Sequence, residues 1–306
     1  MKDVVDHTAP SWIAVDWGTS RFRAFAVGPR GQIIGRTVSD TGMSRLTPEQ
    51  FEPELLSKIE HWMSKAPVTV LACGMVGARQ GWREVPYTAL PTDLSTLRPV
   101  SIPTKDPRLH VAIVPGLSQH SPADVMRGEE MQIAGFLSQN PDFSGTLCLP
   151  GTHSKWCKIE RGALTYFRTV MVGEIFALLC EHSLLRHSVG EGWDENVFRT
   201  SVADVALHGE DPLLALFSIR AGGLLTSNQE TAATARLSGF LIGAELLAAR
   251  KAFPAPEVTL IGSKEMCGRY ASALETIGCQ ARMFDGSELV VAGLAQIARA
   301  TLPDVC

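Results

Sequence analysis

The sequence lacks the features of a membrane-spanning or disulfide-stapled protein. No stretch approaches the roughly 18 consecutive apolar residues that a membrane-spanning helix requires, so no transmembrane segment is predicted. The seven cysteines include no Cys-x-x-Cys pair and have no His-x-x-x-His nearby, which argues against a disulfide framework and a structural zinc site and favours a reducing cytoplasm. The first ten residues are charged at Lys2, Asp3 and Asp6, which leaves no room for the apolar core of a secretion signal.

The sequence also lacks an excess of charge of one sign. Lys and Arg number 28 against 32 Asp and Glu, which gives a net charge of −4. Proteins that bind a nucleic-acid backbone or an anionic membrane need a basic surface, so this composition predicts neither partner. Any anionic ligand must therefore be held by a local group of residues.

The composition that remains is that of a globular protein. With 306 residues, of which 45% are apolar and 20% charged, the chain is long enough for two domains or one large one. Apolar runs separated by turns predict strands in the first half, at 12–17, 21–27, 32–39 and 68–73. A helix is predicted over 48–65, which gives a β-β-β-α-β order.

The second half repeats the opening of this pattern, with strands at 145–150, 156–160 and 164–172. The turn Gly151-Thr152-His153 lies 133 residues after Gly18-Thr19-Ser20, and a repeat of this length indicates duplicated domains rather than a solenoid. A helix over 236–251, a strand over 258–261 and helices over 266–277 and 287–300 follow. The turn Gly262-Ser263 joins strand to helix, a geometry whose helix N-terminus receives phosphate or adenosine groups.

The segment from Asp16 to Arg21 is the first candidate site. A carboxylate at the end of a strand can hold Mg²⁺ directly or through water. The turn formed by Gly18, Thr19 and Ser20 offers N–H groups and hydroxyls to phosphate oxygens. An ordinary hairpin capped by Asp16 is the alternative.

The second candidate site is the matching turn later in the chain. Gly151 and Thr152 can clamp β- and γ-phosphates, with His153 or Lys155 neutralising the charge that develops during phosphoryl transfer. A purely structural histidine is the alternative for His153. The site therefore depends mainly on Gly151 and Thr152.

A third segment supplies carboxylates for acid-base chemistry. If the chain from Asp124 onward is one continuous helix, Glu129 lies inside its apolar stripe and Glu130 on the border of that stripe. A carboxylate in such a stripe must be paired, protonated or facing a cleft. The alternatives are an ion pair of Glu129 with Arg127 or Arg21, and a helix N-cap role for Asp124.

These motifs resemble those of the bacterial 2-dehydro-3-deoxygalactonokinases, sugar-acid kinases of the actin, Hsp70 and hexokinase superfamily. The resemblance rests on Asp-Trp-Gly-Thr-Ser at 16–20, Ala-Cys-Gly-Met-Val-Gly at 72–77, Asp-Val-Met-Arg-Gly-Glu-Glu at 124–130 and Leu-Pro-Gly-Thr-His-Ser-Lys-Trp at 149–156. The five superfamily segments can be placed in order over almost the whole chain. The resemblance implies ATP-dependent phosphorylation of 2-dehydro-3-deoxy-D-galactonate at its 6-hydroxyl, a step of galactonate breakdown.

The resemblance also implies an α/β fold with two ribonuclease H-like domains that flank a nucleotide cleft. The first domain, 1–120, would hold the first phosphate turn and the sugar-acid site. The second domain, 121–306, would hold the second phosphate turn and an adenosine site at Gly262 and Ser263. ATP and Mg²⁺ are the expected cofactors, and a homodimer is compatible with these features.

The resemblance assigns a role to each candidate residue. Asp16 would organise Mg²⁺, and Glu129 would act as the base, because its separation of 22 residues from Gly151 is similar to that in the superfamily. Asp124 and Glu130 are the alternative bases. The candidate phosphate-binding residues are Gly18, Thr19, Ser20, Arg21, Gly151, Thr152, His153 and Lys155. The candidate substrate-binding residues are Arg23, Arg45, Gly74, Met75, Arg79 and Gln80, with the three arginines as cations for the substrate carboxylate.

The sequence departs from the superfamily pattern at two positions. Many kinases of the superfamily have an aspartate as the base, whereas this sequence offers Asp124, Glu129 and Glu130. Pro150 also precedes the second turn where an acidic residue is usual, so the resemblance does not imply a second metal-binding carboxylate there.

Two rival functions are compatible with the same motifs. A phosphohydrolase of the same fold is one rival, but the chain is short and has no basic track for polyphosphate. A nucleotide-dependent assembly or regulatory protein is the other, but no basic helix-turn-helix leader is present.

Overall fold

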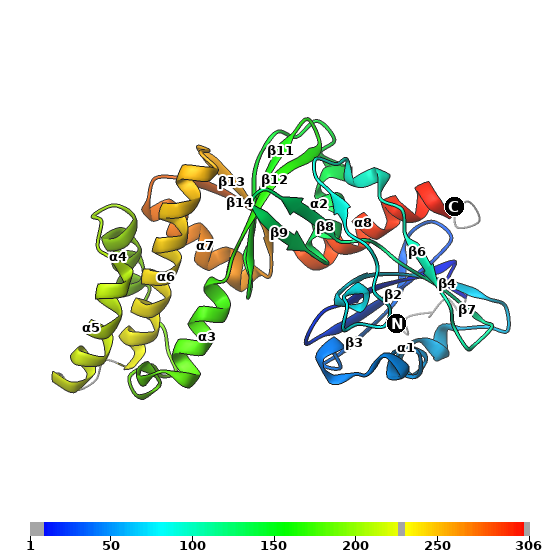
Figure 1. The fold of residues 1–306 in the computed structure, drawn as a ribbon, viewed down its shortest axis with the longest axis horizontal. Helices are drawn as coiled ribbons and strands as arrows, with labels where there is room; N and C mark the ends of the chain where they lie inside the picture. The colour runs from blue at the N-terminus through cyan, green and yellow to red at the C-terminus, as the bar shows by residue number, and fades with distance from the viewer. Residues whose placement is uncertain (1–8, 226–229, 303–306) are drawn as a thin grey trace, which may run out of the picture. The chain divides into compact units, whose positions relative to one another are not determined.

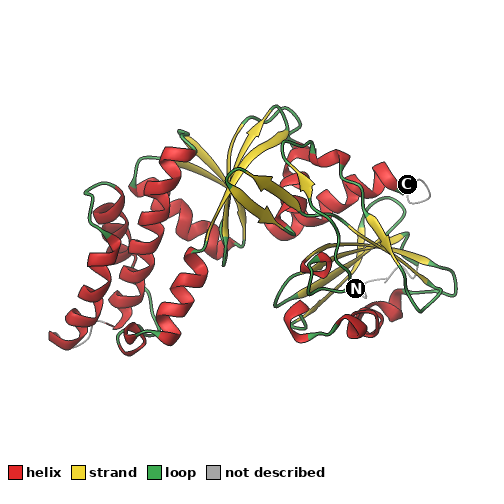
Figure 2. Ribbon diagram, viewed as in Figure 1, coloured by secondary structure: helices red, strands yellow, loops and turns green. Residues whose placement is uncertain are grey.

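The computed structural model describes residues 9–225 and 230–302, which form a mixed α/β fold (Figures 1 and 2). The chain divides into two compact units. Unit 1 consists of Met1–Phe143, Glu160–Tyr166 and Gly286–Cys306, and unit 2 of Ser144–Ile159 and Phe167–Asp285. Lys2, Asp3, Asp6 and Cys306, which entered the sequence argument, lie outside the described residues, and the six described cysteines are free thiols.

Unit 1 is built on a six-stranded mixed sheet with the order β3-β2-β1-β4-β7-β6. Strands β1, β2 and β3 form an antiparallel meander, β4 and β7 continue parallel to β1, and β6 is antiparallel to β7. The strands are β1 (Trp12–Trp17), β2 (Phe22–Val27), β3 (Ile33–Ser39), β4 (Val68–Gly74), β6 (Val100–Ile102) and β7 (Leu109–Ile113). Every residue of β1 is buried, as its unbroken apolar character predicts for a central strand.

One face of this sheet packs on α1 (Phe51–Ile59), which lies between the 3₁₀ turns η2 (Pro48–Gln50) and η3 (Glu60–Trp62). The rings of Trp17 and Phe51 are 4.9 Å apart, and Trp17 also packs edge-on against Phe22 at 4.7 Å. These aromatic contacts anchor the end of β1, and with it the turn that follows. The helix expected over 48–65 is therefore shorter than predicted.

The remaining elements of unit 1 include two helices that lie side by side, α2 (Glu129–Gln139) and α8 (Gly286–Thr301). A Cβ on Gly135 would lie 1.9 Å from the carbonyl oxygen of Leu289, and a Cβ on Gly293 would lie 2.0 Å from that of Met131, so the two backbones are in direct contact. Because α8 belongs to unit 1, the division expected at residue 120 differs from that between the compact units.

A small sheet of β5 (Thr88–Ala89), β8 (Leu117–His120) and β9 (Ala123–Met126) leads into α2. Asp124 therefore lies in a strand, and the prediction that it caps a helix is wrong. The helix begins only at Glu129, because Gly128 has a left-handed backbone with φ of 102° and is itself the N-cap.

Most of a five-stranded sheet with the order β12-β11-β10-β13-β14 belongs to unit 2, while the segment Glu160–Tyr166, where β11 ends and β12 begins, belongs to unit 1. The strands of this sheet are β10 (Gly145–Leu149), β11 (Ser154–Glu160), β12 (Ala163–Val170), β13 (Glu257–Gly262) and β14 (Gln280–Asp285). Strand β10 is antiparallel to β11 and parallel to β13, which is parallel to β14. This is the arrangement of β3-β2-β1-β4-β7 in unit 1. The α/β fold with two ribonuclease H-like units is therefore confirmed.

The helices of unit 2 are α3 (Val172–His182), α4 (Glu195–Ala206), α5 (Pro212–Leu225), α6 (Glu230–Ala252) and α7 (Lys264–Thr276), with the 3₁₀ turn η6 (Leu184–His187). The stretch Ala232–Ala252 of α6 is long and apolar enough to cross a membrane by length and composition, with a mean hydropathy of 1.3. It is 67% buried, and Gly239 lets α6 approach the carbonyl oxygen of Phe198 on α4. These contacts are those of a core helix.

Candidate functional site

Asp16 is the penultimate residue of the buried strand β1, at the edge where the parallel strands of unit 1 have their carboxyl ends. It is 7% exposed and forms an ion pair with Arg23, its partner across the β1–β2 ladder. The Nη1 of Arg23 also donates to the Oγ of Ser287 on α8, 2.9 Å away. Arg23 therefore compensates the buried charge of Asp16 and fixes the direction of its carboxylate.

Two glycines with left-handed backbones place the start of α2 beside Asp16. Gly74, with φ of 93°, ends β4, and a Cβ there would lie 2.7 Å from the carbonyl oxygen of Trp17 and 3.5 Å from the Oδ1 of Asp16. A Cβ on Gly128 would lie 3.4 Å from the Cα of Gly74. The N-terminus of α2 therefore lies at the carboxyl ends of β1 and β4.

Glu129 and Glu130 are the first two residues of α2, and their burial is the reverse of the predicted one. Glu130 is fully buried and its Oε2 accepts a hydrogen bond from the Gly128 N–H at 2.6 Å, whereas Glu129 is half-buried. The prediction was wrong because residues 123–126 are a strand, so the helical phase counted from that segment does not continue into α2.

Burial dominates the electrostatics of this cluster. Desolvation, and then the charge of Glu129, raise the pKa of Glu130 to about 8, although backbone N–H groups lower it. Desolvation and the charges of Asp16 and Glu130 likewise raise the pKa of the Cys73 thiol well above its usual value. Asp16, Glu129 and Glu130 therefore lie around Cys73, and unit 1 gathers three carboxyl groups with one arginine.

The raised pKa of Glu130 predicts a stability cost at alkaline pH. The pKa of Glu130 is about 8 in the folded state, whereas its ordinary value is 4.5. Between pH 4.5 and pH 8 the folded state therefore binds more protons than the unfolded state, and the free energy of unfolding falls as the pH rises through this range. The Glu130→Gln variant lacks this titration. Between pH 5 and pH 8, the free energy of unfolding of the wild type is therefore expected to fall by on the order of a few kcal/mol more than that of Glu130→Gln.

Denaturant unfolding of both proteins at the two pH values measures this difference. The exposed Glu84→Gln provides a matched control in the same unit. Parallel pH profiles for the wild type and Glu130→Gln would contradict the assignment.

The turn after Asp16 is held in place through its carbonyl groups. The backbone N–H groups of Met43 and Ser44 donate to the carbonyl oxygens of Gly18 and Thr19 at 2.9 and 3.0 Å, and the Gly18 N–H donates to the carbonyl oxygen of Arg21 at 2.8 Å. The side chains of Thr19, Ser20 and Arg21 are exposed. The backbone of the turn is thus held by hydrogen bonds to its carbonyl oxygens, and its polar side chains face the solvent.

The candidate substrate residues are divided between this turn and the loop after β4. Arg45 is exposed in η1 (Met43–Arg45), the segment that binds the turn. Met75 begins η4 (Met75–Gly77) directly after Gly74. Arg79 and Gln80 lie beyond it on an exposed turn, and the contacts described above bring neither of them to Asp16.

Arg127 contacts the loop after β4, a role that the sequence motifs do not predict. Its Nη2 donates to the carbonyl oxygen of Val85, and its guanidinium carbon lies 4.1 Å from the centre of the Tyr87 ring. Among the described residues, its Nε and Nη1 are buried without a hydrogen-bond partner, and a Cβ on Gly77 would approach Nη1 to 2.9 Å. Arg127 therefore ties the loop after β4 to the start of α2.

The second turn lies in unit 2, between β10 and β11, and packs on the start of α3. The Glu174 N–H donates to the carbonyl oxygen of Thr152 at 3.0 Å, and a Cβ on Gly173 would lie 2.5 Å from the carbonyl oxygen of Gly151. The Nε2 of exposed His153 lies 2.5 Å from the Oε2 of Glu174. Glycine at 173 is thus required for the close approach of helix and turn.

Lys155 does not extend from this turn into solvent. It is 5% exposed, and its Nζ donates to the Oγ1 of Thr169 on β12 at 2.9 Å. By contrast, a Cβ built on Gly151 meets no atom within 4 Å, and Thr152 is exposed. The open part of the turn is therefore Gly151 to His153.

The Gly262-Ser263 turn lies next to the second turn. A Cβ on Gly262 would lie 3.6 Å from the carbonyl oxygen of Pro150, because β13 is the parallel neighbour of β10. Ser263 is the N-cap of α7, and its Oγ accepts a hydrogen bond from the Met266 N–H. Unit 2 thus brings both of its predicted nucleotide-binding turns to one edge of its sheet.

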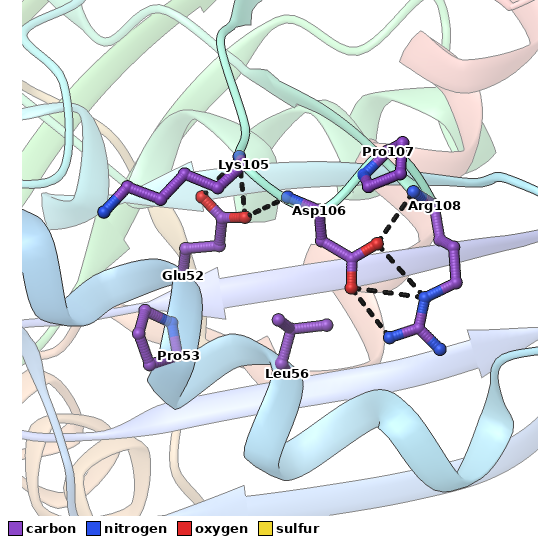
Figure 3. A pocket seen from close by; sticks show the side chains of 7 residues that line it. All are labelled: Glu52, Pro53, Leu56, Lys105, Asp106, Pro107 and Arg108. Atoms are coloured by element: carbon purple, nitrogen blue, oxygen red, sulfur yellow. Dashed lines mark hydrogen bonds and ion pairs between the residues drawn. The ribbon is translucent and has the colours of Figure 1, made fainter.

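Over residues 9–225 and 230–302, no group of three or more His, Cys, Asp or Glu side chains is arranged to hold a metal ion. A pocket of about 480 Å³ in unit 1 is lined by Glu52, Pro53, Leu56, Lys105, Asp106, Pro107 and Arg108 (Figure 3).

The polar groups of this pocket bind one another. The Glu52 carboxylate accepts the N–H groups of Lys105 and Asp106, at 2.8 and 2.7 Å, while Arg108 binds Asp106 and lowers its pKa (Figure 3). Because Glu52 and Asp106 are satisfied within the protein, the pocket indicates a structural hydrogen-bond network.

Comparisons with known proteins agree on one family. The model of the family described as 2-keto-3-deoxy-galactonokinase matches residues 16–297. A Rhizobium meliloti (strain 1021) protein named probable 2-dehydro-3-deoxygalactonokinase DgoK1 is 37% identical, over 97% of this chain and 99% of its own. The Escherichia coli (strain K12) 2-dehydro-3-deoxygalactonokinase is 31% identical, over 94% and 98% of the two chains.

A solved structure gives the same result. A crystal structure from Sinorhizobium meliloti of a protein assigned as a 2-dehydro-3-deoxygalactonokinase superposes with a TM-score of 0.90 at 36% identity. The match covers 95% of this chain and 99% of that one. The likeness therefore extends over both units rather than over a single motif.

Proposed function

Since the chain belongs to the 2-keto-3-deoxy-galactonokinase family, we propose that it transfers the γ-phosphoryl group of ATP to the 6-hydroxyl of 2-dehydro-3-deoxy-D-galactonate. It is a phosphotransferase with an alcohol group as acceptor, and a sugar acid and ATP are its small-molecule partners. The observation that carries the proposal is the family match over residues 16–297, which includes both phosphate turns and the carboxylates of α2. The phosphohydrolase and regulatory alternatives are not favoured.

We assign the role of proton acceptor to Glu129. A general base must reach the hydroxyl that it deprotonates. Glu130 is fully buried, is bonded to Gly128 and, with a pKa of about 8, holds its proton at neutral pH. Asp124 lies in β9, ahead of the turn that leads to α2. Glu129 is half-buried at a helix N-terminus, where the helix dipole favours an anionic side chain.

We assign Mg²⁺ to Asp16. Mg²⁺ in phosphoryl-transfer sites is held by one or two carboxylates together with phosphate oxygens and water, so a single carboxylate fits. The Oδ2 of Asp16 is engaged by Arg23, while its Oδ1 lies beside Gly74, where a Cβ would come within 3.5 Å of it. When bound, the ion supplies positive charge that offsets the charge on the phosphates.

The two turns are assigned to phosphate oxygens, in unit 1 through Gly18, Thr19, Ser20 and Arg21 and in unit 2 through Gly151, Thr152 and His153. Gly262 and Ser263 are assigned to the adenosine part of ATP, which the contact between Gly262 and Pro150 supports. Lys155 remains assigned to this site, although its bond to Thr169 argues for a supporting role.

The substrate carboxylate requires a cation. Arg23 is engaged by Asp16 and Ser287, so Arg45, exposed beside the first turn, fits this role better. Gly74, Met75, Arg79 and Gln80 are assigned to the sugar acid through the loop after β4. A homodimer and a cytoplasmic location are part of the same proposal, the latter because the described cysteines are free thiols.

Thr152→Val is expected to lower kcat/KM for ATP by about 10- to 100-fold, because a hydrogen bond to a charged phosphate contributes roughly 1.5–3 kcal/mol. Steady-state kinetics with ATP as the varied substrate measure the change. Thr276→Val is the matched control, since its hydroxyl bonds only within α7 to the carbonyl oxygen of Ser272. Unchanged kinetics for Thr152→Val would leave the phosphate contact to backbone groups alone.

The function itself is tested by ADP release with a panel of 2-keto-3-deoxy sugar acids derived from galactonate and gluconate. We expect turnover with the galactonate-derived acid and phosphate on its 6-oxygen. Release of ADP and inorganic phosphate without an acceptor would instead support the phosphohydrolase alternative. No turnover with any acid of the panel would overturn the proposal.

A further inference from the structure

Glu245 is a buried carboxylate to which the assigned chemistry gives no role. It lies in α6, is 2% exposed and interrupts a helix that is otherwise apolar enough to cross a membrane. Burying a carboxylate is costly unless hydrogen bonds compensate, so a residue of this kind needs donors close by. Its donors connect it to the parts of unit 2 that carry the nucleotide turns.

Three side chains from two other elements converge on Glu245. The Nε1 of Trp156 donates to its Oε1 at 2.6 Å, and the hydroxyl of Tyr270 donates to its Oε2 at 2.7 Å. The Oγ of Ser154 lies 2.8 Å from the Tyr270 hydroxyl and 3.5 Å from Oε2. The pKa of Glu245 is raised to about 7, because the effect of burial exceeds the opposite effect of these three hydrogen-bonding side chains. Both carboxylate oxygens are therefore engaged.

The partners lie at the ends of the two turns. Ser154 directly follows His153 and is fully buried, so it fixes the point where the second turn enters β11. Tyr270 lies in α7, the helix that Ser263 caps. Gly262, which precedes Ser263 in the adenosine turn, lies beside Pro150. A single carboxylate thus links the strand that ends the phosphate turn to the helix that begins at the adenosine turn.

We propose that Glu245, together with Tyr270, is a positioning residue for the nucleotide, which holds the 151–153 turn and the start of α7 in one fixed relation. This inference rests on the proposed function, because the two turns are assigned to ATP there. The hydrogen bonds of Glu245 and Tyr270 given above are to Ser154, to Trp156 and to each other. Their effect on ATP is exerted through Ser154 and through the axis of α7.

A merely structural role makes a different prediction. Disrupting a buried hydrogen-bond network that only stabilises the fold changes the free energy of unfolding. Such a change leaves ligand affinity unaltered as long as the protein remains folded. A positioning role affects the nucleotide selectively, because pre-organisation of a binding site contributes to affinity. The sugar-acid residues lie in unit 1, so KM for the sugar acid should not change.

The experiment compares Tyr270→Phe and Glu245→Gln with Ser238→Ala. Tyr270→Phe removes one hydroxyl and keeps the ring, so it tests the link even if Glu245→Gln fails to fold. Ser238 is a buried polar residue two turns before Glu245 on the same helix, which makes it a matched control. ADP binding is measured by calorimetry on the intact protein, and KM is measured separately for ATP and for the sugar acid.

We expect both network variants to bind ADP about 5- to 30-fold more weakly than the wild type, the effect of a coupling of roughly 1–2 kcal/mol. KM for ATP should rise in parallel, with KM for the sugar acid within twofold, and Ser238→Ala should match the wild type. Wild-type ADP affinity in Tyr270→Phe would overturn the positioning role alone. Failure of the wild type to bind ADP would overturn the proposed function and this inference with it.

Discussion

Replacing Glu129 with glutamine is expected to lower kcat by about 10²- to 10⁴-fold, the usual cost of losing a general base. The amide keeps the shape of the side chain and can still hydrogen-bond the substrate hydroxyl, but it cannot accept the proton. KM for the sugar acid should therefore change much less than kcat. Steady-state kinetics on folded protein, checked by circular dichroism, measure both constants.

The matched comparisons are Glu130→Gln and Asp124→Asn, measured side by side with Glu129→Gln. Glu130 has no exposed surface and Asp124 lies in β9, so both variants should retain much more activity than Glu129→Gln. If only Asp124→Asn were inactive, the base would lie in the strand before α2. If only Glu130→Gln were inactive, the buried carboxyl group would be the base, and its proton would have to leave on ATP or sugar binding.

Asp16→Asn is expected to abolish turnover while the protein remains folded. The amide can still accept a hydrogen bond from Arg23, which preserves the end of β1, but a neutral group cannot match the charge of a carboxylate toward Mg²⁺. The loss should exceed that of Thr152→Val, because a charge is removed rather than one hydrogen bond. Activity is measured as ADP release at saturating ATP and sugar acid.

Ligand-induced stabilisation separates a metal role from a structural one. Wild-type protein at about one hundred times the dissociation constant of ATP should gain about 2.7 kcal/mol of stability in the presence of Mg²⁺. Asp16→Asn should lose the part of this gain that depends on Mg²⁺, whereas the control Asp106→Asn, in the hydrogen-bond network of Figure 3, should retain it. Near-normal activity in a folded Asp16→Asn would make Asp16 a structural turn residue.

The strands that carry the site could be predicted from local sequence, because each is a continuous apolar run that ends at a glycine turn. Trp12–Trp17 and Gly145–Leu149 are buried almost throughout, which is the pattern that such a run predicts for a central strand. The repeat of glycine-threonine turns after these two strands then indicated two units of one topology. The equivalent strand orders of the two sheets confirm that prediction.

The relative burial of Glu129 and Glu130 could not be predicted in the same way. It depends on where α2 begins, and this is set by the left-handed backbone of Gly128 and its close approach to Gly74, a residue 54 positions earlier. A helical phase has meaning only inside the helix. The contacts of Glu245 also escaped prediction, since Trp156 and Tyr270 reach it from a strand and a helix that are distant in sequence.

The packing of α8 on α2 has a consequence for the order in which the chain acquires its structure. Unit 2 is complete once Asp285 has been synthesised, but unit 1 still lacks the helix whose backbone meets that of Gly135. Domains generally fold as units and in the order of synthesis. In this chain, synthesis of unit 1 begins first and is completed last. The apolar face of α2, the helix that carries Glu129, can therefore be covered by α8 only after residues 286–301 have left the ribosome.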